Sequence, residues 1–243
     1  MQLSWLEDFV ALAQERSFTR AAELRHVTHP AFGRRIRALE AWAGTPLLAR
    51  TVVADWLVAL QPLLHGGGLR ILTRSLAETV ALLERNEADF SLAYDHRALA
   101  ISLDARQFTH VTVASDRLVP VARADAQGAA LHPLSAASVP YLAYAPTLAL
   151  GRLVEDHLAH HRQAPRLQRR VECDSPDAVY EYALRGLGVA WLPWSMVQSD
   201  CQTGRLALAG DPAMEVRFDV RLHRPKRRLG PLAEALWQAI AQR

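Results

Sequence analysis

The sequence is poor in cysteine and lacks long apolar runs. It has two cysteines among 243 residues, Cys173 and Cys201, which excludes a disulfide framework and favours a reducing compartment. The most apolar stretches are broken by Arg, Asp or Glu before they reach the length of a membrane span, so we expect no membrane partner. The opening residues MQLSWLEDF carry acids where a secretory signal is basic and then apolar. We therefore expect a cytoplasmic protein.

The net positive charge is also small, and the position of the basic residues is more informative than their number. The formal net charge is +3 and the isoelectric point about 9.2, too mildly basic to indicate nucleic acid alone. Between Arg20 and Arg37, however, there are five Arg and a single acid, Glu23. Lys226 is the one lysine among 28 basic residues, so abundance of Arg is a general habit of the chain. Only the clustering of Arg near the N-terminus favours a nucleic-acid partner.

The first fifty residues predict three short helices. Leu3, Leu6 and Phe9 recur at helical spacing, and Ser17 or Thr19 can cap a second helix. A third helix is expected over 28–40, because its first turn tolerates a proline that has no amide hydrogen to donate. Two short helices separated by about three residues, the second basic on its outer face, are typical of a helix-turn-helix.

From residue 51 onward, helical and extended patterns alternate. We expect helices at 52–64, 76–86, 148–161, 176–185 and 230–242. We expect strands at 69–74, 89–94, 110–114, 117–123, 140–144, 168–173, 188–192, 205–208 and 215–223. Alternation of this kind predicts an α/β domain built on a parallel sheet, divided into two lobes.

Several stretches resemble the LysR-type transcriptional regulators. SFTRAAEL at 17–24, VTHPAF at 27–32, RRIRALE at 34–40 and PLLAR at 46–50 resemble the DNA-binding domain of that family. LLERNEADF at 82–90, RGLGVAWLP at 185–193 and GRL at 204–206 resemble its effector-binding domain. The resemblance implies an α+β protein of two domains: a winged helix-turn-helix at 1–50, and a two-lobed α/β effector-binding domain of the periplasmic-binding-protein type at 51–243. Lobe I would cover about 51–100 plus 215–243, and lobe II about 110–210.

Two features depart from the family pattern. Gly33 stands where the recognition helix usually has a small polar residue, and glycine costs a helix about 1 kcal/mol relative to alanine. Arg50 is followed directly by Thr51 and by a stretch that resembles the first helix of the family's effector domain. The nine residues at 43–51 are too few for the full wing, the linker helix and the first effector-domain strand. Either residues are missing from the sequence at this junction, or the protein has an internal deletion.

The basic face of the third helix supplies the candidate DNA contacts. Cations are needed at phosphates and hydrogen-bonding groups at base edges, and Thr28 and His29 stand at the helix start, where both are within reach. The alternative is a solvated face with local ion pairs, such as Arg37 with Glu40. The cap, the spacing and the apolar stripe favour DNA. The predicted DNA-binding residues are Arg20, Thr28, His29, Pro30, Gly33, Arg34 and Arg37.

Effector contacts are expected where strands end and helices begin, at the cleft between the lobes. Hydroxyls beside free helix amides would suit a carboxylate or another anion, and aromatic rings would supply flat apolar walls. The alternative is that the hydroxyls only cap helices and that the aromatic rings are core. The predicted effector-binding residues are Ser75, Tyr94, His96, Tyr144, Thr147, Ser175 and Trp191.

No complete catalytic or metal-binding set was found, so we expect no enzyme, no cofactor and no metal. The HGGG stretch at 65–68 lacks the serine elbow that would make it an oxyanion hole. The histidines at 157, 160 and 161 lack nearby cysteine and favour a solvated helix end. Cys173 would sense oxidants if Arg169 or Arg170 stabilised its thiolate, although an inert thiol is the simpler interpretation.

The sequence therefore predicts a bacterial transcription regulator that binds double-stranded DNA through residues 28–40 and responds to a small-molecule effector. A homodimer or homotetramer is expected if the linker is present. One alternative is a small-molecule-binding protein without DNA function, which would follow from a genuine deletion at Arg50. The other is an enzyme on the same scaffold, which turnover of a candidate ligand would reveal.

Replacing Arg34 by alanine is expected to weaken binding to operator DNA, because the substitution removes a phosphate or guanine contact. A mobility-shift titration measures the change. An unchanged affinity would rule out this residue as a DNA contact.

Overall fold

Two units can be distinguished in the computed structural model, which describes residues 7–8, 11, 18–28 and 69–242. The described residues from 74 to 230 form one compact unit. The described residues before 74 and the helix α9 (Pro231–Ala241) belong to the other. The predicted helices at 28–40 and 52–64, and the predicted domain boundary at 50, lie outside the described residues.

The N-terminal unit contains the short helix predicted from its capping pattern. This helix, α2 (Phe18–Leu24), buries Ala21 and Ala22 against Ala11. Just after it, the Nε of Arg25 donates to the Oδ1 of the fully buried Asp8 at 2.9 Å, and its guanidinium also pairs with Glu7. Arg25 is thus held by acids from earlier in the chain and serves the packing of this unit.

The larger unit contains seven strands and four α-helices among its described residues. The strands are β1 (Ser91–Asp95), β2 (Phe108–Arg123), β3 (Val139–Tyr144), β4 (Leu167–Cys173), β5 (Ala190–Pro193), β6 (Leu206–Leu208) and β7 (Val216–Pro225). The helices are α5 (Leu76–Glu84), α6 (Ala149–His160), α7 (Pro176–Leu184) and α8 (Trp194–Gln202), with a 3-10 turn, η2 (Pro212–Met214). None of the described helices is long and apolar enough to cross a membrane.

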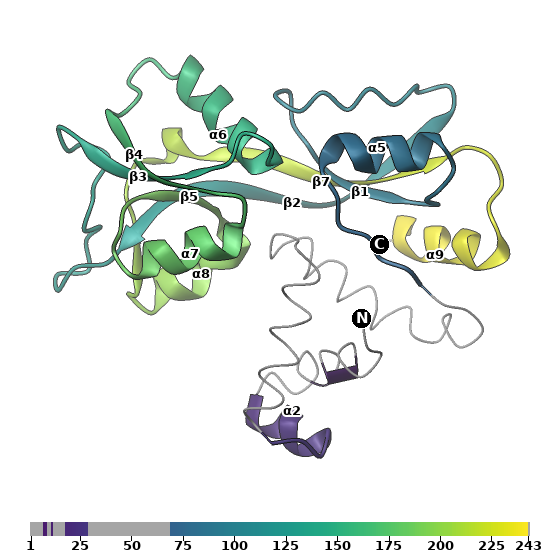
Figure 1. Cartoon of the computed structure of the whole chain (residues 1–243), viewed down its shortest axis with the longest axis horizontal. Coiled ribbons are helices and arrows are strands. Elements are labelled where there is room, and N and C mark those ends of the chain that lie inside the picture. Colours follow the sequence, from purple (N-terminus) through teal and green to yellow (C-terminus); the bar gives the residue numbers. More distant parts are fainter. Residues whose placement is uncertain (1–6, 9–10, 12–17, 29–68, 243) are drawn as a thin grey trace. The chain divides into compact units, whose positions relative to one another are not determined.

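The main sheet is antiparallel throughout, which corrects the expectation of a parallel sheet. Its strand order is β1-β7-β2-β5, with β6 also pairing with β2, and each of these pairs runs antiparallel. Among the described residues, β3 and β4 form a parallel pair, and a single parallel bridge joins Tyr141 of β3 to Val189. The two strands expected at 110–114 and 117–123 are one strand of 16 residues, β2. Its length lets it pair with β7 first and with β5 and β6 near its end, so β2 and β7 run between α5 and the helices α6, α7 and α8 (Figure 1).

Two further expectations about secondary structure were wrong. Residues 69–74 were expected to form a strand, but the structure gives them no regular structure. A strand needs a neighbouring strand for its backbone hydrogen bonds, and the sheets of the described residues do not include this segment. Helix α8, with the sequence WSMVQSDCQ, was not expected at all. Tertiary packing stabilises it by burying Met196 and Val197.

A close backbone approach explains one glycine of the RGLGVAWLP stretch. A Cβ at Gly188 would lie 2.6 Å from the carbonyl oxygen of Pro140, which is closer than real side chains permit. The absence of a side chain lets Val189 donate to that same oxygen at 2.8 Å and accept from the Leu142 amide at 2.9 Å. These bonds join β3 to Val189, the residue directly before β5.

A row of polar side chains crosses the sheet at β1, β7 and β2. His223 is opposite Ser91 on one side and His110 on the other. His223 is 5% exposed, and its ring centroid lies 5.3 Å from that of His110. Burial, reinforced by the neighbouring His110 and Arg221, lowers the pKa of His223 to about 4. The folded protein therefore holds this imidazole neutral at pH values where the unfolded chain protonates it.

We expect the stability of the protein to fall between pH 6.5 and pH 4. In that window His223 is protonated in the unfolded chain but stays neutral in the folded chain. The contribution of His223 to the free energy of unfolding is therefore complete above pH 6.5 and disappears toward pH 4. The loss is on the order of 3 kcal/mol at most. Urea unfolding at several pH values measures it. His223→Gln should flatten the dependence, whereas His160→Gln, at an exposed site on α6, should not; an unchanged slope in His223→Gln would contradict the assignment.

Candidate functional site

A cavity of about 510 Å³ is lined by residues of β1, β2 and β7. A volume of this size suits a small molecule. The cavity contacts the end of β1, the middle of β2 and the start of β7. Its lining residues are Asp95, Ser115, Asp116, Arg117, Arg217, Phe218 and Asp219.

Strand register places carboxylates opposite one another on one side of this cavity. Asp219 of β7 lies opposite Asp95 of β1 and opposite Ser115 of β2. The Ser115 hydroxyl donates to Asp219 Oδ1 at 2.7 Å. A single guanidinium serves both acids, since the Nη2 of Arg221 is 3.0 Å from Asp95 and 3.9 Å from Asp219. Like charges directly opposite each other in a sheet repel. One guanidinium beside two carboxylates leaves this row with a net negative charge.

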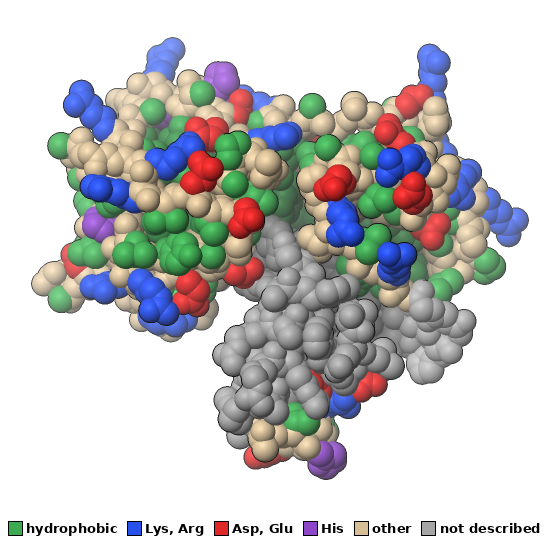
Figure 2. Space-filling model, in the orientation of Figure 1, with side chains coloured by type: hydrophobic (Ala, Val, Ile, Leu, Met, Phe, Trp, Pro, Cys, Tyr) green, Lys and Arg blue, Asp and Glu red, His purple; other side chains and the backbone are tan. Residues whose placement is uncertain are grey.

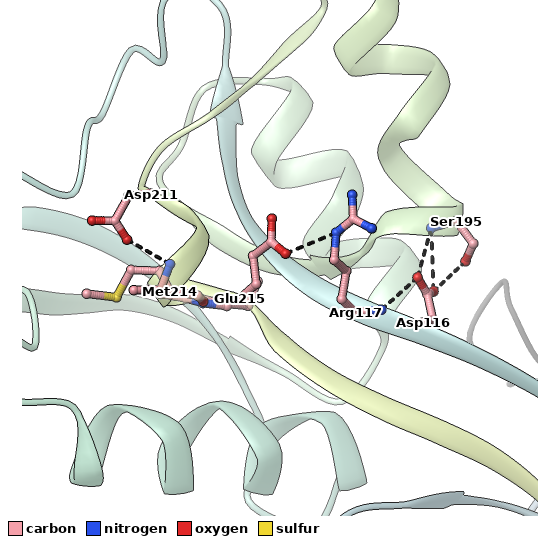
Figure 3. Close-up of polar contacts among 8 residues, drawn as sticks. Asp116, Arg117, Ser195, Asp211, Met214 and Glu215 are labelled. Carbon is pink, nitrogen blue, oxygen red and sulfur yellow. Dashed lines mark hydrogen bonds and ion pairs between the residues drawn. The ribbon is translucent and has the colours of Figure 1, made fainter.

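The next row on the same face places two guanidinium groups opposite one another. Arg117 of β2 lies opposite Arg217 of β7. The Nε of Arg117 is 3.1 Å from Glu215 (Figure 3). Its guanidinium lies over the Trp194 ring, 4.8 Å from the ring centroid. Arg217 is exposed and makes no hydrogen bond or ion pair within the described part of the chain. The cavity therefore presents one cation, Arg217, that pairs with no carboxylate of the described residues.

Asp116 anchors helix α8 to the long strand. Residue Pro193 stands at the N-cap of α8 and provides no side-chain hydrogen bond. Asp116 takes over that role, accepting from the Ser195 hydroxyl at 2.8 Å and from the Ser195 amide at 3.4 Å (Figure 3). A carboxylate at a helix N-terminus is favoured by both the free amides and the helix dipole.

The structure places two of the predicted effector residues in the core. Tyr144 is 3% exposed and donates from its hydroxyl to the Trp191 carbonyl at 2.8 Å. Trp191 is fully buried and donates from its indole nitrogen to the Met214 carbonyl at 2.8 Å. Burial raises the pKa of Tyr144 well above that of a free tyrosine. Both polar groups are satisfied inside the protein, and neither residue lines the cavity.

The predicted hydroxyl residues lie at helix starts. Ser75 accepts from the amide of Glu78 and donates to its carboxylate, forming a capping box on α5. Ser175 accepts from the Ala178 amide at 3.4 Å and caps α7. Thr147 is exposed in the turn before α6. The junctions of Thr147 and Ser175 are neighbours, because they follow the parallel pair β3 and β4, but none of the three hydroxyls lines the cavity.

Tyr94 and His96 flank a lining residue without lining the cavity themselves. The Tyr94 ring packs edge-on against Phe218, with centroids 4.9 Å apart, and so supports the cavity wall. His96 accepts from the Ala98 amide at 3.1 Å through Nδ1, and burial lowers the pKa of its imidazole. Asp95, between them, is the residue that reaches the cavity.

Only part of the predicted DNA-binding set falls within the described residues. Arg20 lies in α2, and Thr28 is exposed shortly after that helix. The other five residues lie outside the described part of the chain. They are His29, Pro30, Gly33, Arg34 and Arg37.

Most lining residues were missed because they lie in mid-strand and not at strand ends. Ser115, Asp116 and Arg117 occupy the point at which the apolar text of β2 is interrupted. Arg217 and Asp219 lie near the start of β7 and belong to its alternation of polar and apolar residues. Charged residues inside two long strands were the available signal. The prediction of a parallel sheet instead placed the expected site where strands end and helices begin.

The residues proposed to activate Cys173 are engaged by other groups. Arg169 pairs with Glu155 at 2.8 Å and with Glu172 at 2.7 Å. Arg170 donates to Gln168 at 3.0 Å. Cys173 itself is a free, half-buried thiol. Among the described residues, no group of three or more His, Cys, Asp or Glu side chains is placed to hold a metal ion.

Comparison with known proteins identifies the family. The model of the LysR substrate binding domain matches residues 12–243. The chain belongs to the LysR-type family of transcriptional regulators. The fold of the effector-binding region is accordingly the two-lobed α/β fold of the periplasmic-binding-protein type, with a mixed arrangement of helices and strands.

One curated relative of this LysR-type regulator matches along its whole length. The HTH-type transcriptional regulator YjiE of Escherichia coli (strain K12) is 26% identical over 290 aligned residues, covering 100% of this chain and 95% of the relative. Because the relatives are regulators, the expectation of a non-enzymatic family is confirmed.

Solved structures of full-length regulators share the fold. HypT from Salmonella typhimurium, described as a hypochlorite-specific LysR-type transcriptional regulator, matches with a TM-score of 0.67 and 21% identity, covering 100% of this chain and 97% of that chain. DarR from Vibrio fischeri, solved in complex with DNA, matches with a TM-score of 0.62 and 26% identity, covering 100% and 99%.

Replacing Asp116 by alanine in this LysR-type regulator should lower the free energy of unfolding by about 1 kcal/mol, because α8 loses its cap. Asp116→Asn keeps an acceptor oxygen and should lose less. Urea unfolding of the full chain measures both. Glu181→Ala, at an exposed and loosely paired acid on α7, is the control and should have little effect. If Asp116→Ala were as stable as the unmodified protein, the capping role would be refuted.

Proposed function

We propose that this LysR-type regulator binds double-stranded DNA through residues 28–40 and responds to a small molecule bound in the cavity between β1, β2 and β7. The observation that carries this proposal is the likeness, over the entire chain, to full-length regulators that include one solved on DNA. The contacts with DNA would come from the predicted residues Arg20, Thr28, His29, Pro30, Gly33, Arg34 and Arg37.

The contacts around the cavity support its role as the effector site. On one side, Asp95 and Asp219 are tied together by Arg221, within the sheet that α5 covers. On the other side, Asp116 is bonded to the start of α8 and Arg117 to Glu215. A ligand that contacts both sets of residues would therefore change the preferred angle between the two ends of β2 and β7. Such a differential contact is what a population shift requires.

The regulator is proposed to act as a homodimer or homotetramer, since paired recognition helices read paired DNA half-sites. The short junction at Arg50 bears directly on this proposal, because the family's dimerising helix belongs there. The second candidate function follows from the same junction: a chain shortened inside the linker would bind a small molecule without binding DNA.

Selection from a random pool of DNA duplexes tests the proposal. The full chain should enrich one sequence motif, and its affinity for that motif should fall steeply as salt rises, because arginines displace counterions from phosphates. Size-exclusion chromatography of the same preparation reports the oligomer. Arg162→Ala, at an exposed residue far along the chain, is the control for loss of charge and should retain binding. A monomer that enriches no sequence would establish the second candidate function.

A further inference from the structure

We infer that the effector is a dipolar molecule, carrying a cationic group and an anionic group several bonds apart, as in an ω-amino acid or a basic amino acid. The inference rests on the proposed function only for calling the ligand an effector. The binding chemistry itself follows from the two rows of like charge that face the cavity.

The first row requires a cation. Asp95 and Asp219 lie directly opposite each other, with side chains 30% and 40% exposed to solvent at the cavity. Arg221 contacts Asp95 closely but is 3.9 Å from Asp219. Ser115 gives Asp219 one neutral hydrogen bond, which leaves much of its charge uncompensated. An ammonium or guanidinium group on the ligand would supply the missing charge.

The second row requires an anion. Arg117 and Arg217 lie directly opposite each other, and only Arg117 has a carboxylate partner, Glu215. A carboxylate on the ligand beside Arg217 would complete this row as the ligand's cation completes the first.

The strand geometry fixes the separation of the two ligand groups. Asp219 and Arg217 are two residues apart on β7, and therefore on the same face and about 7 Å apart along the strand. An α-ammonium next to an α-carboxylate is too short for this span. A chain of four or five carbons between the charged groups, or the side chain of a basic amino acid, reaches it.

A ligand of one charge fits less well. The lining has three carboxylates and two guanidiniums, and the directly paired Glu215 and Arg221 keep the balance at one excess negative charge. A simple anion would be repelled by this excess of negative charge. The inferred ligand is therefore dipolar, in place of the plain carboxylate expected from the sequence. A simple cation would cover Arg217 and leave it without a partner.

A series of matched length tests the inference on the full chain without DNA. Isothermal titration would compare 5-aminovalerate with pentylamine and with valerate, which keep the chain length and remove one charge each. Glycine, 4-aminobutyrate, lysine and arginine extend the range of separations. At least one long dipolar compound should bind ten or more times tighter than glycine, pentylamine and valerate. Equal binding of valerate, or no binding by any dipolar compound, would overturn the inference.

Two variants should exchange selectivity in opposite directions. Asp219→Asn should weaken the dipolar ligand about tenfold and improve valerate relative to it, because the acidic row is removed. Arg217→Gln should weaken the dipolar ligand and improve pentylamine. Asp174→Asn and Arg106→Gln change exposed residues outside the cavity and should leave binding unchanged. A misfolded variant would lose every ligand alike, which circular dichroism of the free protein would also show.

The outcomes separate this inference from the proposed function. Failure to bind DNA, with intact selectivity for dipolar ligands, would refute only the proposed function. DNA binding together with preference for a simple anion would refute only the ligand class.

Discussion

The antiparallel pairing of β2 with β7 is the contact on which the main unit depends. It runs from Phe108 opposite Pro225 to Leu118 opposite Val216, and the register shifts once, between Thr112 and Ala114. Because side chains alternate between the faces of a strand, that shift decides which residues of β2 share a face with Asp219. A slip by one residue would exchange the polar row for the apolar one and would remove the cavity lining altogether.

The same pairing keeps an unfavourable arrangement of charge at one place in an otherwise satisfied sheet. Elsewhere, charged groups of opposite sign are interspersed over the face seen in Figure 2. In the cavity, acid lies opposite acid and base opposite base, with one shared guanidinium and one unneutralised arginine. Local departures from good pairing are expected at functional sites, where a ligand completes what the protein omits. The stability of the surrounding core, including the fully buried Trp191, maintains that arrangement.

The sequence located the helices of this unit better than it located the site. Two helix starts carry a side-chain cap, Ser75 with Glu78 on α5 and Ser175 before Pro176 on α7. A cap binds an amide only three residues away, so a short stretch of sequence is enough to indicate it. The same hydroxyls were predicted to contact an effector, and the structure commits them to those caps. Strand direction was not encoded locally, so the rule for parallel sheets was applied to a sheet that is antiparallel.

The sequence by itself determined the family and the order of most elements, since each follows from short contiguous patterns. Only the tertiary structure decided that 69–74 remains outside the sheet and that α8 forms. It alone also brought Ser115 to Asp219, which are 104 positions apart, and Asp116 to Ser195, which are 79 apart. Contacts at such separations depend on the register between whole strands and on how helices pack beside them, and no local pattern of residues specifies either.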